Sequence, residues 1–220
     1  MGKKILKELS ISRIIKYVIG MVLIAFSVTL MLKSDIGNSS WDTLHYSMEH
    51  LFNISFGMAT IIVATFFMIM VIILNRDFKY LLMWIPVLIV GPLIDLFIYL
   101  VDAKTVAEIF TVQILYFTLG ITLLPLGGAF LLISNYPAGV FDEFNLAVVH
   151  KLKLKSLVPT RVIMELTAVL IAFILGRIAG IGYGKIGVGT LIFAITVGIF
   201  LKTYLKLFER IGLYENQQTN

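Results

Sequence analysis

Six long runs of apolar residues, separated by short polar segments, constrain this chain more than any other feature of its sequence. The runs cover about residues 13–33, 57–75, 80–101, 109–133, 158–177 and 186–208. About 20 apolar residues suffice to cross the hydrocarbon core of a bilayer as a helix. Hydrophobic residues make up 59% of the chain and charged residues only 14%. The pattern therefore predicts an all-α integral membrane protein with six transmembrane helices.

Lys and Arg are distributed unevenly between the loops that six spans would create. With a cytoplasmic N-terminus, 14 of the 18 basic residues lie on or near the cytoplasmic side, and 4 lie outside: Lys33, Lys104, Arg177 and Lys185. Cytoplasmic loops of membrane proteins are enriched in these residues. We therefore predict a multi-pass protein with both termini cytoplasmic. Membrane orientation also accounts for the net charge of +5 without a nucleic-acid partner.

The chain contains an internal repeat with an offset of one hundred residues. Identical pairs are Ile14 and Ile114, Gly20 and Gly120, Leu23 and Leu123, Leu32 and Leu132, Ser34 and Ser134, Asp42 and Asp142, His50 and His150, and Thr60 and Thr160. Three spans in each half is an odd number, so the halves 1–108 and 109–220 would be inverted in the membrane. Inverted repeats are common in transporters. The alternative is a duplication that only builds a stable bundle.

A short polar helix is predicted after the first span of each half, in "SSWDTLHYSMEH" from Ser39 and in "VFDEFNLAVVH" from Val140. Asp42 and Asp142 fall in the first turns, where a carboxylate stabilises a helix through its dipole. Two interpretations remain open. The helices are either interfacial, or re-entrant with the aspartates pointing into a cavity, because irregular backbone at membrane depth needs protein or water around it.

The segments "SSWDTLH" after the first span and "GPLIDLF" in the third span resemble the YczE/YyaS/YitT-type bacterial integral membrane proteins, YczE-like members most closely. The resemblance extends over most of the chain. It implies a multi-spanning protein of the bacterial cell membrane and does not define an activity. YitT-type members carry an additional soluble C-terminal domain, and we expect none here because the sequence ends at Asn220.

Asp95 is the strongest single candidate for a solute or ion path, which Asp42 and Asp142 would extend. It lies within the third span, where an ionisable residue is costly unless it has a function or a partner. Gly91 and Pro92 come shortly before it, and a proline within a helix frees a backbone carbonyl.

A second candidate region lies at the centre of the first and fourth spans. Pro125, Gly127 and Gly128 favour a break in the fourth span, and Ser27 and Thr29 supply hydroxyls in the first. Broken helices near the membrane midplane commonly bind solute in transporters. Close helix packing is the alternative explanation for the glycines.

Proton coupling is considered for His50, His150 and Glu165, because imidazole titrates near neutral pH and carboxylates within spans often carry protons. Ordinary interfacial histidines, and a local ion pair of Glu165 with Arg161, are the alternatives. The chain has no cysteine, and its three histidines do not form a ligand set, so we predict no metal and no cofactor.

We predict a transporter or permease for a small polar or ionisable molecule. The alternative is a membrane accessory protein that binds a lipid or assists another membrane protein. A small substrate-binding subunit of an energised vitamin importer is a rival within transport. No nucleophile motif or nucleotide loop supports an enzyme. The predicted partners are the lipid bilayer and an unidentified small molecule, and a homo-oligomer is compatible with this prediction.

Overall fold

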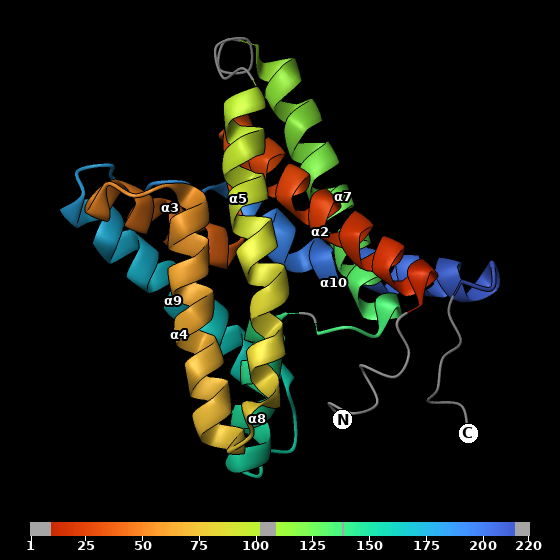
Figure 1. Cartoon of the computed structure of the whole chain (residues 1–220). Helices are drawn as coiled ribbons and strands as arrows, with labels where there is room; N and C mark the ends of the chain where they lie inside the picture. Colours follow the sequence, from red (N-terminus) through yellow and green to blue (C-terminus); the bar gives the residue numbers. More distant parts are fainter. Residues whose placement is uncertain (1–9, 102–108, 138, 214–220) are drawn as a thin grey trace.

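The computed structural model describes residues 10–101, 109–137 and 139–213, and all regular elements in these ranges are helical. The elements, in chain order, are α2 (Ile11–Ser34), α3 (Ser40–Phe52), α4 (Phe56–Asn75), η1 (Phe78–Met83), α5 (Trp84–Leu100), α7 (Phe110–Ser134), α8 (Val140–Lys151), α9 (Val158–Ile178) and α10 (Val188–Arg210) (Figure 1). Lys3, Lys4, Lys7 and Lys104, which entered the orientation count, lie outside the described residues.

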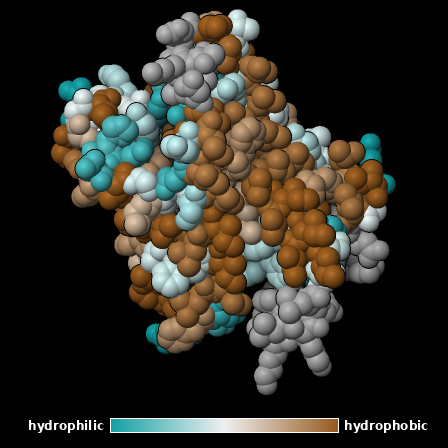
Figure 2. Space-filling view, turned by 45° about the horizontal axis from the view of Figure 1, so that its top comes forward, coloured by the Kyte–Doolittle hydropathy of each residue, from teal (hydrophilic) through white to brown (hydrophobic). Residues whose placement is uncertain are grey.

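Six of these helical segments are long and apolar enough to cross a membrane: α2, α4, η1 with α5, α7, α9 and α10. This result confirms the prediction of an all-α chain with six candidate spans. Their outward faces carry large apolar side chains, and Figure 2 shows hydrophobic residues over most of one face of the molecule. Such a continuous apolar surface suits contact with lipid rather than with water.

Helices α2 and α7 form the centre of the molecule. Half of the apolar window of each is buried, compared with 17–33% in the other four spans. The two helices cross closely at Gly20 and Gly127, where a methyl group on either glycine would lie 2.8 Å from the carbonyl oxygen of the other. Small residues allow this close approach of two backbones.

The two short helices pack against spans from the other half of the chain. Helix α3 lies along α9, where Ser47 Oγ donates a hydrogen bond to the Ala172 carbonyl at 2.8 Å. Helix α8 packs against α4, and the rings of Phe67 and Phe144 meet edge to face with centroids 4.9 Å apart. Helix α5 contacts α2 and α4, and α10 contacts α7.

Helices α2 and α7 end in the same local structure. Ser34 Oγ donates to the Met31 carbonyl at 2.7 Å and accepts from the Ile36 amide. Ser134 Oγ makes the corresponding bonds to Leu131 and Tyr136. Each helix then stops at a left-handed residue, Asp35 or Asn135, with φ of 58° and 59°. Asp and Asn tolerate this conformation better than most residues.

Connecting segments and helix ends that are far apart in the sequence contact one another in two places. The backbone N–H of Asn38 donates to the Lys185 carbonyl at 3.2 Å, so the segment after α2 contacts the segment before α10. Elsewhere, Tyr17 Oη donates to the Pro137 carbonyl at 2.7 Å, and Lys16 Nζ donates to the Leu213 carbonyl at 3.1 Å. The start of α2 therefore lies beside the end of α10 and the link between α7 and α8.

Candidate functional site

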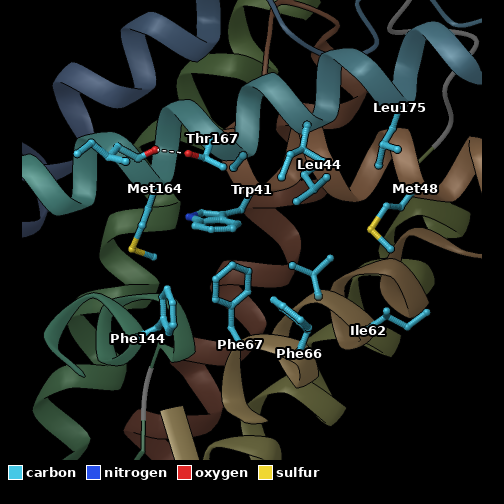
Figure 3. A pocket seen from close by; sticks show the side chains of 14 residues that line it. Trp41, Leu44, Met48, Ile62, Phe66, Phe67, Phe144, Met164, Thr167 and Leu175 are labelled. Carbon is cyan, nitrogen blue, oxygen red and sulfur yellow. Dashed lines mark hydrogen bonds between the residues drawn. The ribbon is translucent and has the colours of Figure 1, made fainter. Parts of the chain in front are cut away.

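A cavity of about 460 Å³ lies between α3, α4, α8 and α9 (Figure 3). We call it the apolar chamber. Its lining residues are Trp41, Leu44, Met48, Ile62, Val63, Phe66, Phe67, Phe144, Ile163, Met164, Thr167, Ala168, Ile171 and Leu175. Thr167 is the single hydroxyl among them, and its Oγ1 donates to the Ile163 carbonyl within α9. The chamber therefore offers apolar and aromatic contact almost exclusively.

Aromatic rings from three helices form one wall of the apolar chamber. Figure 3 shows Trp41 of α3, Phe67 of α4 and Phe144 of α8 around the same space. Trp41 stacks on Phe141 with a centroid distance of 4.1 Å and meets Phe67 edge to face at 5.0 Å. These contacts hold the indole in one orientation.

The chamber is partly open between α4 and α9. Phe66 and Ile163 belong to its lining and are 59% and 64% exposed. Both residues lie on spans, in the apolar lateral surface that suits contact with lipid. An apolar molecule could therefore enter the chamber sideways from a bilayer.

A second, smaller cavity of about 100 Å³ adjoins the chamber, and we call it the polar pocket. It is lined by Trp41, Phe141, Asp142, Asn145, Arg161, Met164 and Glu165. Trp41 and Met164 line both cavities, so the two spaces share a wall. The pair forms an amphipathic site, with an apolar space next to a charged one.

Arg161 lies at the centre of the charges in the polar pocket. Its Nη1 lies 3.3 Å from Oδ1 of Asp142, which is on α8. Its Nε lies 3.5 Å from Oε1 of Glu165, which is on α9 like Arg161 itself. Glu165 Oε2 also accepts a hydrogen bond from Ser40 Oγ on α3 at 2.8 Å. Three helices from both halves of the chain thus meet at one cation, two carboxylates and a hydroxyl.

Asn145 contributes an unused acceptor to the polar pocket. Its side chain is 6% exposed, and its Nδ2 donates to the Leu157 carbonyl at 3.3 Å. Its Oδ1 has no hydrogen-bond partner among the described residues. A buried acceptor without a partner costs about 1–3 kcal/mol, so such atoms commonly mark a place for a ligand or a water.

Asp42 lies outside the polar pocket, in the first turn of α3 beside the N-cap residue Ser39. Ser39 Oγ donates to Asp42 Oδ2 at 2.6 Å and accepts from the Asp42 amide at 3.2 Å. His45 Nδ1 lies 3.7 Å from Asp42 Oδ1, and the opposite ring nitrogen of His45 has no partner among the described residues. The two repeat-related aspartates therefore have different surroundings.

Asp95 lies at another position and binds the start of α4. Its Oδ2 accepts from Ser55 Oγ at 2.6 Å, and its Oδ1 accepts from the Gly57 amide at 2.7 Å. The first amides of a helix have no partner within the helix, so a carboxylate that accepts from one of them acts as a cap. The described contacts do not bring Asp95 together with Asp142 or Glu165.

The central residues of the first and fourth spans are engaged in helix contacts. Ser27 Oγ donates to the Gly120 carbonyl at 2.6 Å, and Thr29 Oγ1 donates to the Ala25 carbonyl at 3.0 Å. Gly127 lies at the crossing of α2 and α7, and a methyl group on Gly128 would be 3.8 Å from Leu201. Helix α7 runs without interruption through Pro125, so the break expected there is absent.

The histidines considered for proton coupling lie at the ends of the short helices. His50 Nδ1 is 3.0 Å from the Tyr46 carbonyl and 3.9 Å from Glu49, and burial raises the pKa of the Glu49 carboxyl. His150 is exposed in the last turn of α8. Of the three residues considered, only Glu165 lines the amphipathic site.

The sequence interpretation missed Trp41, Asn145 and Phe144 as site residues and treated Arg161 only as the local partner of Glu165. One signal was present, because Trp41 and Phe141 are related by the offset of one hundred. Aromatic residues in a chain with 12% Phe, Trp and Tyr do not stand out without the tertiary contacts.

Comparison with known proteins supports the family resemblance. The model of a family of unknown function, DUF6198, matches residues 11–206. The chain is similar to the uncharacterized protein YyaS of Bacillus subtilis (strain 168), with 24% identity over 202 residues that cover 92% of this chain and 96% of that protein. It is also similar to the uncharacterized membrane protein YczE of the same organism, with 27% identity over 187 residues, 84% of this chain and 82% of that protein. No solved structure matches.

Proposed function

Because the chain belongs to the DUF6198 family, a family of unknown function, we propose its function from its own site. The protein is a transporter or permease for a small molecule that has an apolar body and a polar or ionisable head. The observation that carries this proposal is the amphipathic site, in which a chamber of about 460 Å³ adjoins a pocket containing Asp142, Arg161 and Glu165. Ligand sites typically combine a mainly apolar cavity with a few well-placed polar groups.

The proposal includes two inverted repeats that meet at this site, one within 1–108 and one within 109–220. Several contacts support it, because they recur when the two halves are exchanged: α3 with α9 and α8 with α4, and α5 with α2 and α10 with α7. Trp41 and Phe141, which occupy equivalent positions, stack directly on each other. The axis relating the halves would pass between these two rings.

Alternating access follows from this arrangement. The apolar chamber is lined by α3 and α4 from the first half and by α8 and α9 from the second. Rocking one half against the other about a fixed central contact would therefore open the site to each side of the membrane in turn, as in other inverted-repeat transporters. The close crossing of α2 and α7 would be the fixed contact, because the two backbones meet there without intervening side chains.

We place the protein in the bacterial cell membrane with both termini in the cytoplasm. The basic residues support this orientation, and so does the contact of Lys16 with Leu213, which joins the two ends of the described chain on one side. In this orientation the short helices α3 and α8 approach the site from opposite faces of the membrane.

The test is uptake by proteoliposomes that are incubated with a bacterial metabolite extract, washed and analysed by mass spectrometry. We expect at least one compound to be enriched over protein-free vesicles and to be lost with Thr167→Phe, which extends a ring into the chamber. Thr203→Phe is the matched control, because Thr203 on α10 is also exposed and makes the same bond to the carbonyl four residues earlier.

The second candidate function is a membrane accessory protein that holds a lipid or amphiphile without moving it. The lateral opening of the chamber between Phe66 and Ile163 favours this alternative. The same experiment separates the two functions. If the vesicle contents match those of protein-free vesicles and a compound remains bound to the purified protein, the result supports a binding function and contradicts transport.

A further inference from the structure

The charges that surround the polar pocket do not cancel. Asp142 and Glu165 contribute two carboxylates, and Arg161 contributes one guanidinium, so the ionised pocket carries one net negative charge. The arginine is not placed to balance a further anion, because both of its neighbours already share its charge. The side chains of Arg161 and Asp142 are 53% and 69% exposed, so solvent screens their charges, whereas the Glu165 side chain is only 26% exposed. Glu165 would therefore attract a positively charged ligand head most strongly and would repel a carboxylate head.

The hydrogen-bonding groups of the pocket point to the same chemistry. Asn145 is only 6% exposed, and its Oδ1 is an acceptor without a partner in the part of the chain that the structure describes. Its amide nitrogen donates one of its two hydrogens to the Leu157 carbonyl, and the side-chain oxygen is the atom left without a partner. A hydrogen-bond donor on a ligand, such as an ammonium group, would satisfy this oxygen.

The shared wall of the two cavities suits a polar head next to an apolar body. Trp41 and Met164 line both spaces, and Trp41 stacks on Phe141, which also lines the polar pocket. Because the faces of these two rings lie against each other, the shared wall supplies apolar contact beside the polar pocket. The apolar chamber beyond Trp41 provides about 460 Å³ for the rest of the molecule.

We propose that the amphipathic site binds an organic amine in its protonated form, with the ammonium group in the polar pocket at Glu165, Asp142 and Asn145 and the hydrocarbon or aromatic body in the apolar chamber. This inference deepens the proposed function and rests on the same site. It assigns a sign of charge and a hydrogen-bonding character to the ligand head, which the proposed function leaves open.

The test compares three tritiated compounds that share one aromatic body: 2-(1-naphthyl)ethylammonium, 2-(1-naphthyl)ethanol and 1-naphthylacetate. Equilibrium binding is measured by scintillation proximity on the full chain in nanodiscs of zwitterionic lipid. The signal that remains with the Thr167→Phe variant, whose chamber is filled by a ring, is taken as partition of the compound into the lipid and is subtracted from the signal of the wild-type protein. We expect the ammonium compound to bind about tenfold more tightly than the alcohol, and the carboxylate to bind more weakly than either.

Two variants of the polar pocket should act in opposite directions. Glu165→Gln should weaken ammonium binding about tenfold and should affect the alcohol much less, because the amide keeps the shape and loses the charge. Arg161→Gln should tighten ammonium binding, a gain that misfolding cannot produce. Glu209→Gln, an exposed residue at the end of α10, makes the same change of charge outside the site and should alter none of the three affinities.

The inference is overturned if the carboxylate binds most tightly, if the three compounds bind equally, or if Glu165→Gln leaves ammonium binding unchanged. Its failure is distinguishable from that of the proposed function. Selective ammonium binding without uptake into proteoliposomes would contradict the proposed transport function and would leave the charge assignment of the ligand intact. Uptake of metabolites with no preference for amines, lost in Thr167→Phe, contradicts the charge assignment alone.

Discussion

Asp95 illustrates how a single carboxylate within a spanning segment can be satisfied by its own chain. Its two oxygens bind Ser55 Oγ and the Gly57 amide, at the beginning of the neighbouring helix α4. In an apolar environment a backbone amide without a partner is expensive. The carboxylate therefore links α5 to α4 and satisfies an amide at the same time.

We expect Asp95→Ala to lower the free energy of unfolding by about 1–2 kcal/mol, the usual cost of losing a helix cap. Asp95→Asn should cost less, because the amide oxygen can still accept one bond. Uptake per folded molecule should remain near the wild-type level for both variants. The measurements are thermal unfolding in detergent and the proteoliposome assay, each corrected for the amount of folded protein.

Ser55→Ala provides the comparison, because it removes the same hydrogen bond from the other partner, together with the bond that Ser55 Oγ accepts from the Met58 amide. The double variant should lose less stability than the sum of the two single variants, as expected for residues in direct contact. A loss of uptake with unchanged unfolding in Asp95→Asn would instead place Asp95 in the solute path, as the sequence interpretation proposed.

At the level of residues, the sequence predicted local contacts better than distant ones. The pairing of Arg161 with Glu165 follows from their spacing of four residues on one helix, and the structure contains it. The additional contacts to Asp142 and Ser40 depend on where α8 and α3 pack, which spacing along the chain does not define. The same limitation explains why Trp41 and Asn145 were not proposed as site residues.

At the level of helices, glycines decide how closely the central pair can pack. A methyl group on Gly20 would lie 2.8 Å from the Gly127 carbonyl oxygen and 2.9 Å from a methyl carbon of Leu131, well inside normal contact distance. The helices would have to move apart to accept it. Gly198, in α10, is also helical, but apart from its own helix turn none of the described residues has an atom within 4 Å of such a methyl group.

We therefore expect Gly20→Ala to lower the free energy of unfolding by about 1–3 kcal/mol, the usual cost of overpacking. Gly198→Ala should be neutral or should stabilise the protein by up to about 1 kcal/mol through its higher helix propensity. Thermal unfolding of the two purified variants measures the difference. Equal effects of the two substitutions would show that the crossing of α2 and α7 is not tightly packed.

The sequence predicted the helices themselves accurately and their pairing poorly. Apolar runs define spans because every backbone group must be satisfied within a helix when lipid surrounds it. The run estimated at about residues 57–75 corresponds to α4, Phe56–Asn75. The packing of α3 along α9 joins residues such as Ser47 and Ala172, which are 125 positions apart, and apolar patterning contains no information about such contacts.

At the level of the whole molecule, the contact between the segment after α2 and the segment before α10 leads to a prediction about topology. The segment after α2 and the segment before α10 share the hydrogen bond of Asn38 with Lys185 and a salt bridge of Lys185 with Asp35 at 2.6 Å. Six crossings from a cytoplasmic N-terminus place both of these segments outside. They place the link between α8 and α9, which contains Ser156, inside.

The absence of native cysteine allows a direct test, because every thiol in a variant is then an introduced one. Tyr183→Cys reports on the outer segment, since Tyr183 is 66% exposed, and Ser156→Cys reports on the inner one. In intact cells, the Tyr183→Cys variant should react with a membrane-impermeant maleimide. The Ser156 variant should react only after the membrane is permeabilised. Reaction of both variants from the same side would contradict six crossings, and with them the inverted repeat on which alternating access depends.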